Sequence, residues 1–468
     1  MNARRLGKAI TYFVILAFML ASCTSTSATP HTPIPILTPP TFTLSPTSTQ
    51  TPTSTATVIP TPLGAGGYFF ALNTWKQVVL VGLNGQEIVR TNNTNNQDFA
   101  FGKAIWSSNG RHLTFVGYKK DQTNTFNDYG LYSFDATDDF TNLHQIVSNS
   151  TQVGQFAWSP NEEQLAYITG GSPSLSTRGT LFLASPPNYE PIQLTDYGVN
   201  NFAWSPDGKF LAISAAPPTR KTSISTVYIL NLSDPNPTPV RLDYQQYNFI
   251  YNLSWSPNGE YISFTGAMGS GIYIYSNDCL IYDVKRLKLI RQYKRQDNLI
   301  WSPDGSHFVL TSFFKLVVRN LYNDSETELD LPQGQRFWPV SLLSDNIQWS
   351  PNGEYIAYVT RSDTFAPYSL HVSKADGSEN RTLLDQAPLG EDNSIPDGFD
   401  WSPDSRHIVF IKYEGDQYGV YIADVGTWNI RRLFTINETL SNVAWQPVST
   451  SGMIPLPEAT PTFWETAP

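Results

Sequence analysis

The sequence predicts an all-β fold built from one repeated unit. Seven segments share a turn of the type Trp204-Ser205-Pro206-Asp207-Gly208, and Trp445-Gln446-Pro447 is a truncated eighth; successive tryptophans of these turns are 44 to 52 residues apart. A nearly fixed period in this range is typical of repeat architectures. Stretches of strand length with apolar or alternating character flank the turns. The tryptophans of the eight turns are Trp106, Trp158, Trp204, Trp255, Trp301, Trp349, Trp401 and Trp445.

Each repeat predicts four antiparallel strands. Proline presets φ in the turn and glycine accepts a positive φ, which is the chemistry of a tight connection between two strands. In the repeat of Trp204 the expected strands are 201–204, 210–214, 226–230 and 239–242. Four strands per repeat form one blade of a β-propeller. We interpret the tryptophans as wedges between blades and assign none of them to a ligand.

The two ends of the repeat region are complementary. Three strand-like segments, 68–72, 77–81 and 87–90, precede the first tryptophan turn, and the strand 442–445 has no strands after it. Together they would complete a blade and remove the exposed edges that an open sheet must protect. The prediction is an eight-bladed β-propeller over residues 67–447, closed by N- and C-terminal strands, with seven blades as the alternative.

These residues resemble the repeats of TolB-like propellers, which also occur in relatives of dipeptidyl peptidase IV. In that family the Trp-Ser-Pro-Asp-Gly turn is followed by a Leu-Ala-Phe-like and then an Ile-Tyr-Val-like strand, and 355–358 and 418–424 match these two strands. The resemblance implies the fold, while propellers host many unrelated functions. The sequence contains no Gly-x-Ser-x-Gly motif, so the peptidase activity of that family is not expected. TolB's own partners are not expected either, because a linker takes the place of its N-terminal domain.

The N-terminal residues 1–22 predict an export signal. Arg4, Arg5 and Lys8 precede an uncharged run, which ends in Leu20-Ala21-Ser22-Cys23. The last four residues resemble the lipobox of bacterial lipoproteins, and this resemblance implies that Cys23 is acylated and becomes the mature N-terminus. The alternative is an ordinary signal peptide with an incidental cysteine. Lipidation would anchor the protein to a membrane without spanning it.

Two further segments are not expected to fold. Of the 39 residues 24–62, 28 are Thr, Ser or Pro and none is charged, so residues 23–66 predict a lipidated cysteine followed by a disordered stalk. Residues 448–468 predict a flexible tail. The expected location is the bacterial cell envelope, with the protein lipid-anchored on the extracytoplasmic side of the plasma membrane or the outer membrane.

Composition excludes several function classes. With 40 acidic and 30 basic residues the net charge is −10, which disfavours nucleic-acid binding. Two cysteines in 468 residues exclude a disulfide framework. Cys279 lies in an apolar strand and is expected to be a buried thiol.

Candidate catalytic and metal-binding residues do not converge in the sequence. His112, His307 and His407 each lie six residues after a repeat tryptophan, so we interpret them as one structural position of the repeat rather than a metal site. Two acidic groups could hold Ca²⁺ but lack the spacing of a calcium loop, and solvated loop acids are the simpler interpretation. We predict no catalytic residue, no metal and no cofactor. The acidic groups are Asp135, Asp138 and Asp139, and Glu391, Asp392 and Asp397.

Candidate binding residues lie on the long loops. In a propeller the loops from second to third strands, and from each fourth strand to the next blade, lie on one face, which we call the loop face. Loops on a rigid scaffold carry function, and Tyr, Trp and Arg are the usual anchors of interfaces. The alternative is that each side chain packs on its own blade. The candidates are Tyr197, Tyr244, Tyr247, Arg336, Phe337, Trp338, Phe365 and Tyr368.

We therefore expect a membrane-anchored extracytoplasmic lipoprotein whose propeller is a protein-binding or scaffolding module. It is expected to be a monomer without enzymatic activity, with a protein or glycan partner at the loop face. The alternatives are an envelope enzyme acting on peptides or glycans, and a carbohydrate-binding module. Convergent acids with shifted pKa values in the central funnel would favour the enzyme.

Overall fold

A computed structural model describes the repeat region. The described residues are 68–73, 78–82, 87–90, 99–120, 126–135, 143–147, 152–161, 164–170, 178–216, 224–234, 237–242, 247–270, 273–312, 315–337, 346–363, 366–389, 398–437 and 440–447. All of them belong to the second of two compact units, Met1–Val58 and Ile59–Pro468. The predicted signal peptide, Cys23, the stalk and the tail lie outside the described residues.

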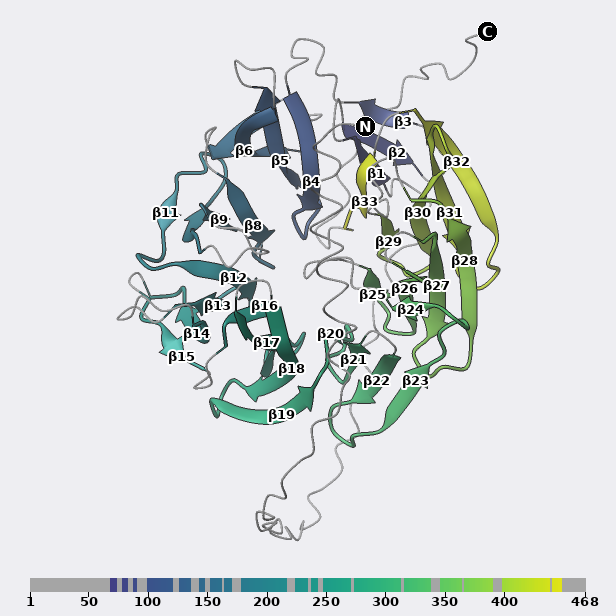
Figure 1. The fold of residues 1–468 in the computed structure, drawn as a ribbon. Coiled ribbons are helices and arrows are strands. Elements are labelled where there is room, and N and C mark those ends of the chain that lie inside the picture. Colours follow the sequence, from purple (N-terminus) through teal and green to yellow (C-terminus); the bar gives the residue numbers. More distant parts are fainter. Residues whose placement is uncertain are drawn as a thin grey trace, which may run out of the picture. The chain divides into compact units, whose positions relative to one another are not determined.

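Every described element is a strand, and seven of the antiparallel sheets contain consecutive strands (Figure 1). We number these sheets as blades 1 to 7. Blade 1 contains β4 (Phe99–Trp106), β5 (His112–Lys120), β6 (Phe126–Asp135) and β7 (Leu143–Val147). Blade 2 contains β8 (Val153–Trp158), β9 (Leu165–Thr169), β10 (Thr180–Ala184) and β11 (Ile192–Gln193). Blade 3 contains β12 (Val199–Trp204), β13 (Phe210–Ala215), β14 (Thr226–Asn231) and β15 (Val240–Arg241).

The remaining consecutive blades follow the same order. Blade 4 contains β16 (Phe249–Trp255), β17 (Tyr261–Ser270), β18 (Tyr273–Asp283) and β19 (Lys288–Lys294). Blade 5 contains β20 (Asn298–Trp301), β21 (His307–Ser312), β22 (Lys315–Asn320) and β23 (Glu326–Leu329). Blade 6 contains β24 (Arg336–Phe337), β25 (Ile347–Trp349), β26 (Tyr355–Arg361), β27 (Tyr368–Lys374) and β28 (Asn380–Ala387). Blade 7 contains β29 (Phe399–Trp401), β30 (His407–Tyr413), β31 (Tyr418–Asp424) and β32 (Ile430–Ile436).

One more sheet joins the two ends of the repeat region, and we call it the closing blade. Its strand order is β3 (Glu87–Arg90), β2 (Val78–Gly82), β1 (Tyr68–Asn73) and β33 (Leu440–Trp445). β1 pairs with β33 in the register Phe69↔Trp445 and Ala71↔Val443. The predicted fold class is confirmed, including the sheet formed from N- and C-terminal strands.

The tryptophan turns are held by their own polar side chains. Ser205 Oγ donates to Asp207 Oδ1 at 2.6 Å and accepts from Phe210 N at 2.9 Å. Gly208 has φ +69°, and a Cβ there would lie 2.8 Å from Asn161 Cγ of the preceding blade's turn, so glycine avoids strain at this position. At Asp207, hydrogen bonds from Ser205 and the backbone outweigh the effect of partial burial and lower the carboxyl pKa. The expected chemistry of the turn is therefore confirmed.

The predicted wedge role of the tryptophans is also confirmed. Indole Nε1 atoms donate to the preceding blade: Trp204 to Ala157 O (3.1 Å), Trp255 to Ala203 O (3.1 Å), Trp301 to Ser263 Oγ (2.9 Å) and Trp349 to Ile300 O (3.2 Å). The residue six positions after one tryptophan packs on the tryptophan of the next blade. These ring pairs are His112–Trp158, Phe210–Trp255, Tyr261–Trp301, Tyr355–Trp401 and His407–Trp445.

This contact explains two of the three repeated histidines. His112 stacks on Trp158 with ring centroids 5.0 Å apart, and His407 stacks on Trp445 at 6.3 Å. They occupy the place that Phe or Tyr fills in other blades, so they share a structural position. His307 instead contacts Ser306 Oγ through Nδ1 (2.7 Å) and Asn320 Nδ2 through Nε2 (3.0 Å).

A fourth histidine gives blade 6 a predicted pH dependence. His371 is 1% exposed, with Nε2 2.8 Å from Thr360 Oγ1 and Nδ1 3.0 Å from Thr382 Oγ1. Burial lowers its pKa from 6.5 to about 4, although the charge of Asp385 opposes the shift. The unfolded chain therefore binds a proton at His371 more readily than the folded chain does. The stability that the neutral, buried imidazole contributes is complete above about pH 6.5 and is lost as the pH falls through 4.

We expect the free energy of unfolding to fall by about 3 kcal/mol through this group between pH 7 and pH 4. Denaturant unfolding of the wild type and of His371→Gln over this pH range measures it. The glutamine variant should lack this part of the decline, and parallel pH profiles of the two proteins would contradict the assignment.

Candidate functional site

Polar side chains of the first strands bridge neighbouring blades. Gln155 of β8 donates to Phe202 O at 2.8 Å and accepts from Phe202 N at 2.9 Å in β12. The series continues with Asn201 to Ile250 O (2.9 Å), Asn252 to Asp297 O (3.2 Å), Gln348 to Phe399 O (3.3 Å) and Trp445 N to Asp400 Oδ2 (2.7 Å). We call these side chains the inner-strand ladder, because the first strands face the middle of the propeller in Figure 1.

The ladder satisfies backbone groups at a sheet edge that has no further strand to pair with. Gln155, Asn252, Gln348 and Asp400 are partly exposed, so the same groups can hydrogen-bond a molecule that approaches this edge. Gln348 and Asp400 directly precede their tryptophans, whereas Gln155, Asn201 and Asn252 follow a signal in the sequence, since amides recur three residues before the repeat tryptophans. These positions are Gln155, Asn201, Asn252, Asn298, Asn346 and Asn442.

The ladder bond from Asn252 to Asp297 O lies beside a cluster of titratable groups between blades 4 and 5. Asp297 is half-buried, and this burial raises its pKa, although Asn277 Nδ2 donates to its Oδ1 at 3.2 Å. Burial and the nearby Asp297 raise the pKa of Tyr251, whose hydroxyl has no hydrogen-bond partner among the described residues. Burial raises the pKa of the Cys279 thiol to about 12. The expected buried thiol at Cys279 is thus confirmed.

The cluster offers one protonatable carboxyl but no convergent pair of acids. Elsewhere in the described part of the chain, the carboxyls whose pKa departs clearly from its ordinary value have it lowered. At Asp207, Asp283 and Asp304 the hydrogen bonds lower the pKa by more than burial raises it. At Asp376 and Glu379 the main cause of the lowered pKa is a hydrogen bond, from Ser378 and Arg381 respectively. An acid–base pair of the kind used in hydrolysis needs two groups with different pKa values in one place.

Two arginines lie at the ends of strands that meet the loop face. Arg178, just before β10, donates from Nε to Asn200 Oδ1 (3.2 Å) and from Nη2 to Ile224 O (3.0 Å), which joins blade 2 to blade 3. Arg361 ends β26 and is buried. Burial lowers the pKa of both guanidinium groups, that of Arg361 to about 10, but leaves them charged at neutral pH. Neither arginine was expected from the sequence.

The candidate binding residues divide by burial. Tyr247, Phe337 and Tyr368 are buried, and Tyr368 donates its hydroxyl proton to Ile411 O at 3.2 Å. Tyr197 is half-buried, and burial raises its pKa to about 12. Arg336 is exposed at the start of β24. Packing on the blades, the alternative interpretation, thus describes the three buried side chains, while the binding role of all candidates stays a prediction. Tyr244, Trp338 and Phe365 lie outside the described residues.

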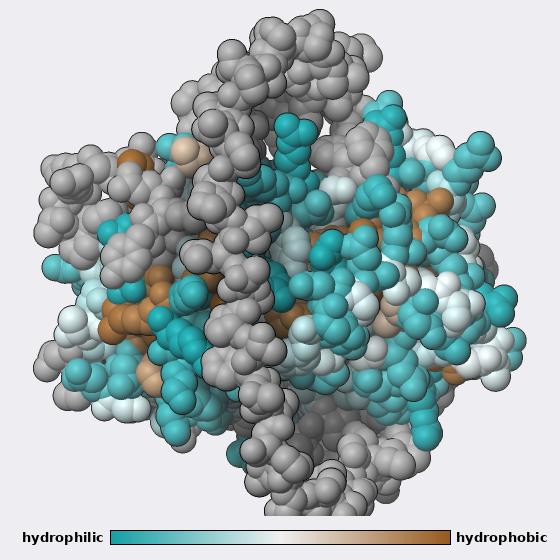
Figure 2. Space-filling view, turned by 90° about the horizontal axis from the view of Figure 1, so that it is seen from below, coloured by the Kyte–Doolittle hydropathy of each residue, from teal (hydrophilic) through white to brown (hydrophobic). Residues whose placement is uncertain are grey.

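Apolar side chains also reach the outer surface. In the view of Figure 2 the surface is mostly hydrophilic, with apolar residues in separate patches. Most of the exposed large apolar residues lie in fourth strands or the turns before them, and Met268 lies in the second strand β17. The full set is Leu143, Ile192, Val240, Met268, Leu287, Tyr322 and Ile430.

No cluster of three or more His, Cys, Asp or Glu residues suited to a metal ion occurs among the described residues. Asp135 ends β6, and the other acids considered for Ca²⁺ lie outside the described ranges. The same part of the chain contains no helix long and apolar enough to cross a membrane.

Comparison with known proteins places the repeats in a family. The family model described as "Eukaryotic translation initiation factor eIF2A" matches residues 99–216 and 201–365. The two matches together span more than half of the chain, which therefore belongs with the propellers that this model describes. "Tol-Pal system protein TolB" of Coxiella burnetii is 25% identical over 145 residues, 31% of this chain and 30% of that protein. The chain is a TolB-like β-propeller.

Two further matches agree with this assignment. TolB of Francisella tularensis is 24% identical over 201 residues, 37% of this chain and 42% of that protein. The chain thus spans 30% to 42% of the length of these curated relatives. A solved structure of "Dihydro-heme d1 dehydrogenase NirN in complex with DHE" has a TM-score of 0.53 at 12% identity, over 81% of this chain and 75% of that one. At this identity it shows a similarity of fold alone.

Proposed function

We propose that this TolB-like propeller is a binding module of the bacterial cell envelope. The lipid on Cys23 holds it at the extracytoplasmic side of a membrane, and the stalk gives it reach. A protein partner binds the loop face of a monomeric propeller. The relatives named as Tol-Pal system proteins support a role in protein assembly. No chemistry is required of the site.

The observation that carries the proposal is the inner-strand ladder. It places partly exposed amides on a rigid scaffold, and fixed hydrogen-bonding groups are what a partner's backbone or polar side chains need. Arg178 and Arg361 add positive charge at the strand ends that meet the loop face. Such charges steer partners and select among them more than they add affinity.

Charge reversal on the loop face tests the proposal. A partner is first cross-linked to the full-length protein in intact cells, identified, purified and tested for direct binding. We expect Arg336→Glu to weaken binding at least tenfold, because a charge reversed at an interface repels the partner's complementary charge. Arg406→Glu is the matched control, since Arg406 is exposed beside the turn of Trp401 on the opposite face. Equal loss in both variants, or loss in Arg406→Glu alone, would refute a loop-face site.

Asp297 favours a second candidate function, that of an envelope enzyme acting on peptides or glycans. A half-buried carboxyl with a raised pKa beside Tyr251 is a feature of general acids. Hydrolysis of a peptide or glycan that the wild type performs and Asp297→Asn lacks, with partner binding retained, would establish it.

A further inference from the structure

A groove between blades 3 and 4 opens on the face that carries the tryptophan turns, which we call the turn face. It has a volume of about 270 Å³. Phe210 and Ile229 of blade 3 and Trp255 and Val284 of blade 4 form its apolar walls. A cavity of about 150 Å³ already accommodates benzene in an apolar setting, so this groove has room for an aromatic side chain.

The equivalent groove between blades 6 and 7 is filled by the chain itself. Val425 and Val284 are equivalent, because their N–H groups bond the carbonyl oxygens of Arg406 and Glu260, each five residues after a repeat tryptophan. Three residues after Val425, Trp428 has φ +57° and packs edge-on against Tyr355 at 5.7 Å. Tyr355 and Trp428 both pack against the buried cluster that contains Trp401, so the indole occupies the place equivalent to the open groove.

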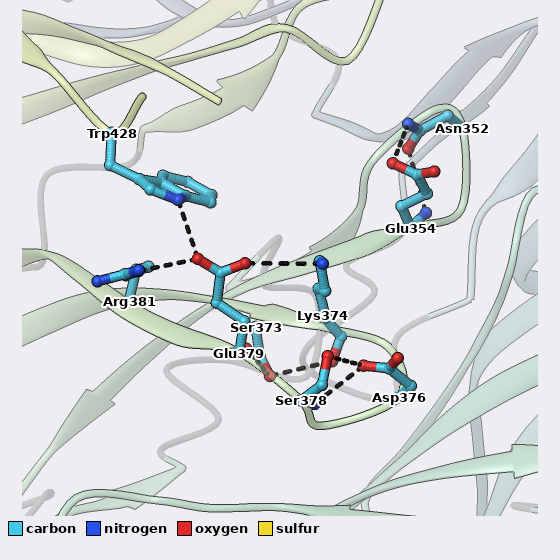
Figure 3. A network of polar contacts seen from close by, with 9 residues as sticks. All are labelled: Asn352, Glu354, Ser373, Lys374, Asp376, Ser378, Glu379, Arg381 and Trp428. Atoms are coloured by element: carbon cyan, nitrogen blue, oxygen red, sulfur yellow. Dashed lines mark hydrogen bonds and ion pairs between the residues drawn. The ribbon is translucent and has the colours of Figure 1, made fainter. Parts of the chain in front are cut away.

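Trp428 is also anchored by a charge on blade 6. Its Nε1 donates to Glu379 Oε1 at 3.1 Å, and Arg381 Nε donates to the same oxygen at 2.9 Å. Figure 3 shows the indole pointing toward this carboxylate from the neighbouring blade. In blade 5 the equivalent residue, Asp324, also has a positive φ and pairs with Arg291 of blade 4 at 3.2 Å. This turn position thus serves to bridge a blade to its predecessor.

Blade 4 lacks such a bridge. Its equivalent residue is Leu287, which has φ +50° and is 40% exposed. The fourth strand of blade 3, β15, has two residues, and Val240 opposite Ile229 is 48% exposed. Directly opposed side chains lie on the same side of a sheet, so Val240 extends the apolar wall beyond the groove.

We propose that this groove is a docking site for an indole side chain, and that its occupant is Trp464 of this chain's own C-terminal segment. The groove has the same place and the same aromatic wall as the one that Trp428 fills, which favours an indole over an aliphatic group. Phe463-Trp464 is the aromatic pair of residues 448–468. The inference is independent of the proposed loop-face function.

The point where the described chain ends allows this contact. Gln446 Nε2 donates to Gly110 O at 2.9 Å, so the chain leaves the closing blade beside a tryptophan turn, on the turn face. Trp464 lies 17 residues after Pro447. An extended chain of that length reaches at most about 60 Å, which exceeds the diameter of about 55 Å expected for a domain of this size.

Disulfide trapping in the full-length protein tests the proposal. Glu465→Cys is combined with Asn258→Cys, which lines the open groove, or with Asp404→Cys, the equivalent turn position at the groove that Trp428 closes. After mild oxidation with copper–phenanthroline, we expect at least tenfold more intramolecular disulfide with Asn258→Cys, because docking raises the local concentration of the thiol. Cys279 is buried and does not compete.

Two further changes decide what occupies the groove. Trp464→Ala should reduce the Asn258→Cys disulfide to the level of the Asp404→Cys control. Leu287→Trp, which recreates the arrangement at Trp428, should do the same by filling the groove from blade 4, while Leu287→Ala should leave the disulfide in place. Equal trapping at both positions, trapping insensitive to Trp464→Ala, or disulfides only between two copies would each overturn the proposal.

Discussion

Cys23→Ser should abolish incorporation of labelled palmitate into the protein. The resemblance of Leu20-Ala21-Ser22-Cys23 to a lipobox implies that acyl chains are attached at this thiol, and serine cannot form the thioether. Each buried CH₂ contributes about 0.8 kcal/mol to membrane binding, so losing the acyl chains removes most of the anchoring free energy. The measurement is palmitate labelling with immunoprecipitation, together with the mass of the mature N-terminus.

Fractionation completes this test. With residues 1–22 replaced by an ordinary cleavable signal peptide, the Cys23→Ser protein should be almost entirely soluble, because no apolar leader remains to hold it at the membrane. Ser22→Ala, which keeps a small residue before the cysteine, should still be labelled and membrane-bound. Labelling that survives Cys23→Ser, or a wild-type mature N-terminus elsewhere than Cys23, would show that the cysteine is incidental.

Trp301→Ala should lower the free energy of unfolding by about 3 to 5 kcal/mol. The indole is buried between blades 4 and 5, with Phe308 edge-on at 5.5 Å and Tyr261 stacked at 6.2 Å. Its Nε1 donates to the buried Ser263 Oγ, which would be left without this partner. The loss therefore combines a cavity with an unsatisfied polar group.

Denaturant unfolding with Trp301→Phe and Tyr322→Ala as companions measures this effect. Phenylalanine keeps part of the ring packing but not the hydrogen bond, so its cost should be clearly smaller. Tyr322 is 62% exposed in the turn between β22 and β23 of the same blade, and its replacement should cost less than about 0.5 kcal/mol. A Trp301→Ala protein as stable as Tyr322→Ala would mean that the repeat tryptophans do not wedge the blades together.

The sequence predicted the blades because the turn chemistry is local. Ser205, Asp207 and Gly208 hold their turn through their own hydrogen bonds and φ angle, and eight copies place the strands between them. The closing blade was also predictable, since segments at both ends had strand patterns without partners in their own repeat. The stack of His407 on Trp445 shows that a repeated histidine needs no metal to explain it.

The site was less predictable, because burial depends on how a loop returns to its blade. The sequence does not distinguish an aromatic loop residue that packs inward from one that faces a partner. The structure places both Phe337 and Tyr368 in the core. Asn252 belongs to a recurring series of amides in the sequence, but only the adjacent blade reveals its bond to Asp297 O. The raised pKa of Asp297 likewise comes from burial between two repeats, which no single repeat encodes.

Hydrogen–deuterium exchange of the protein with and without its purified partner tests the central claim most directly. A partner on the loop face should protect the amides around Asn252, in the middle of β16, around Asp297, just before β20, and around Arg336. The tryptophan turns, such as 205–208 and 302–305, should exchange at the same rate in both states. Protection confined to those turns, with none at Asn252, Asp297 or Arg336, would contradict the proposed loop-face site.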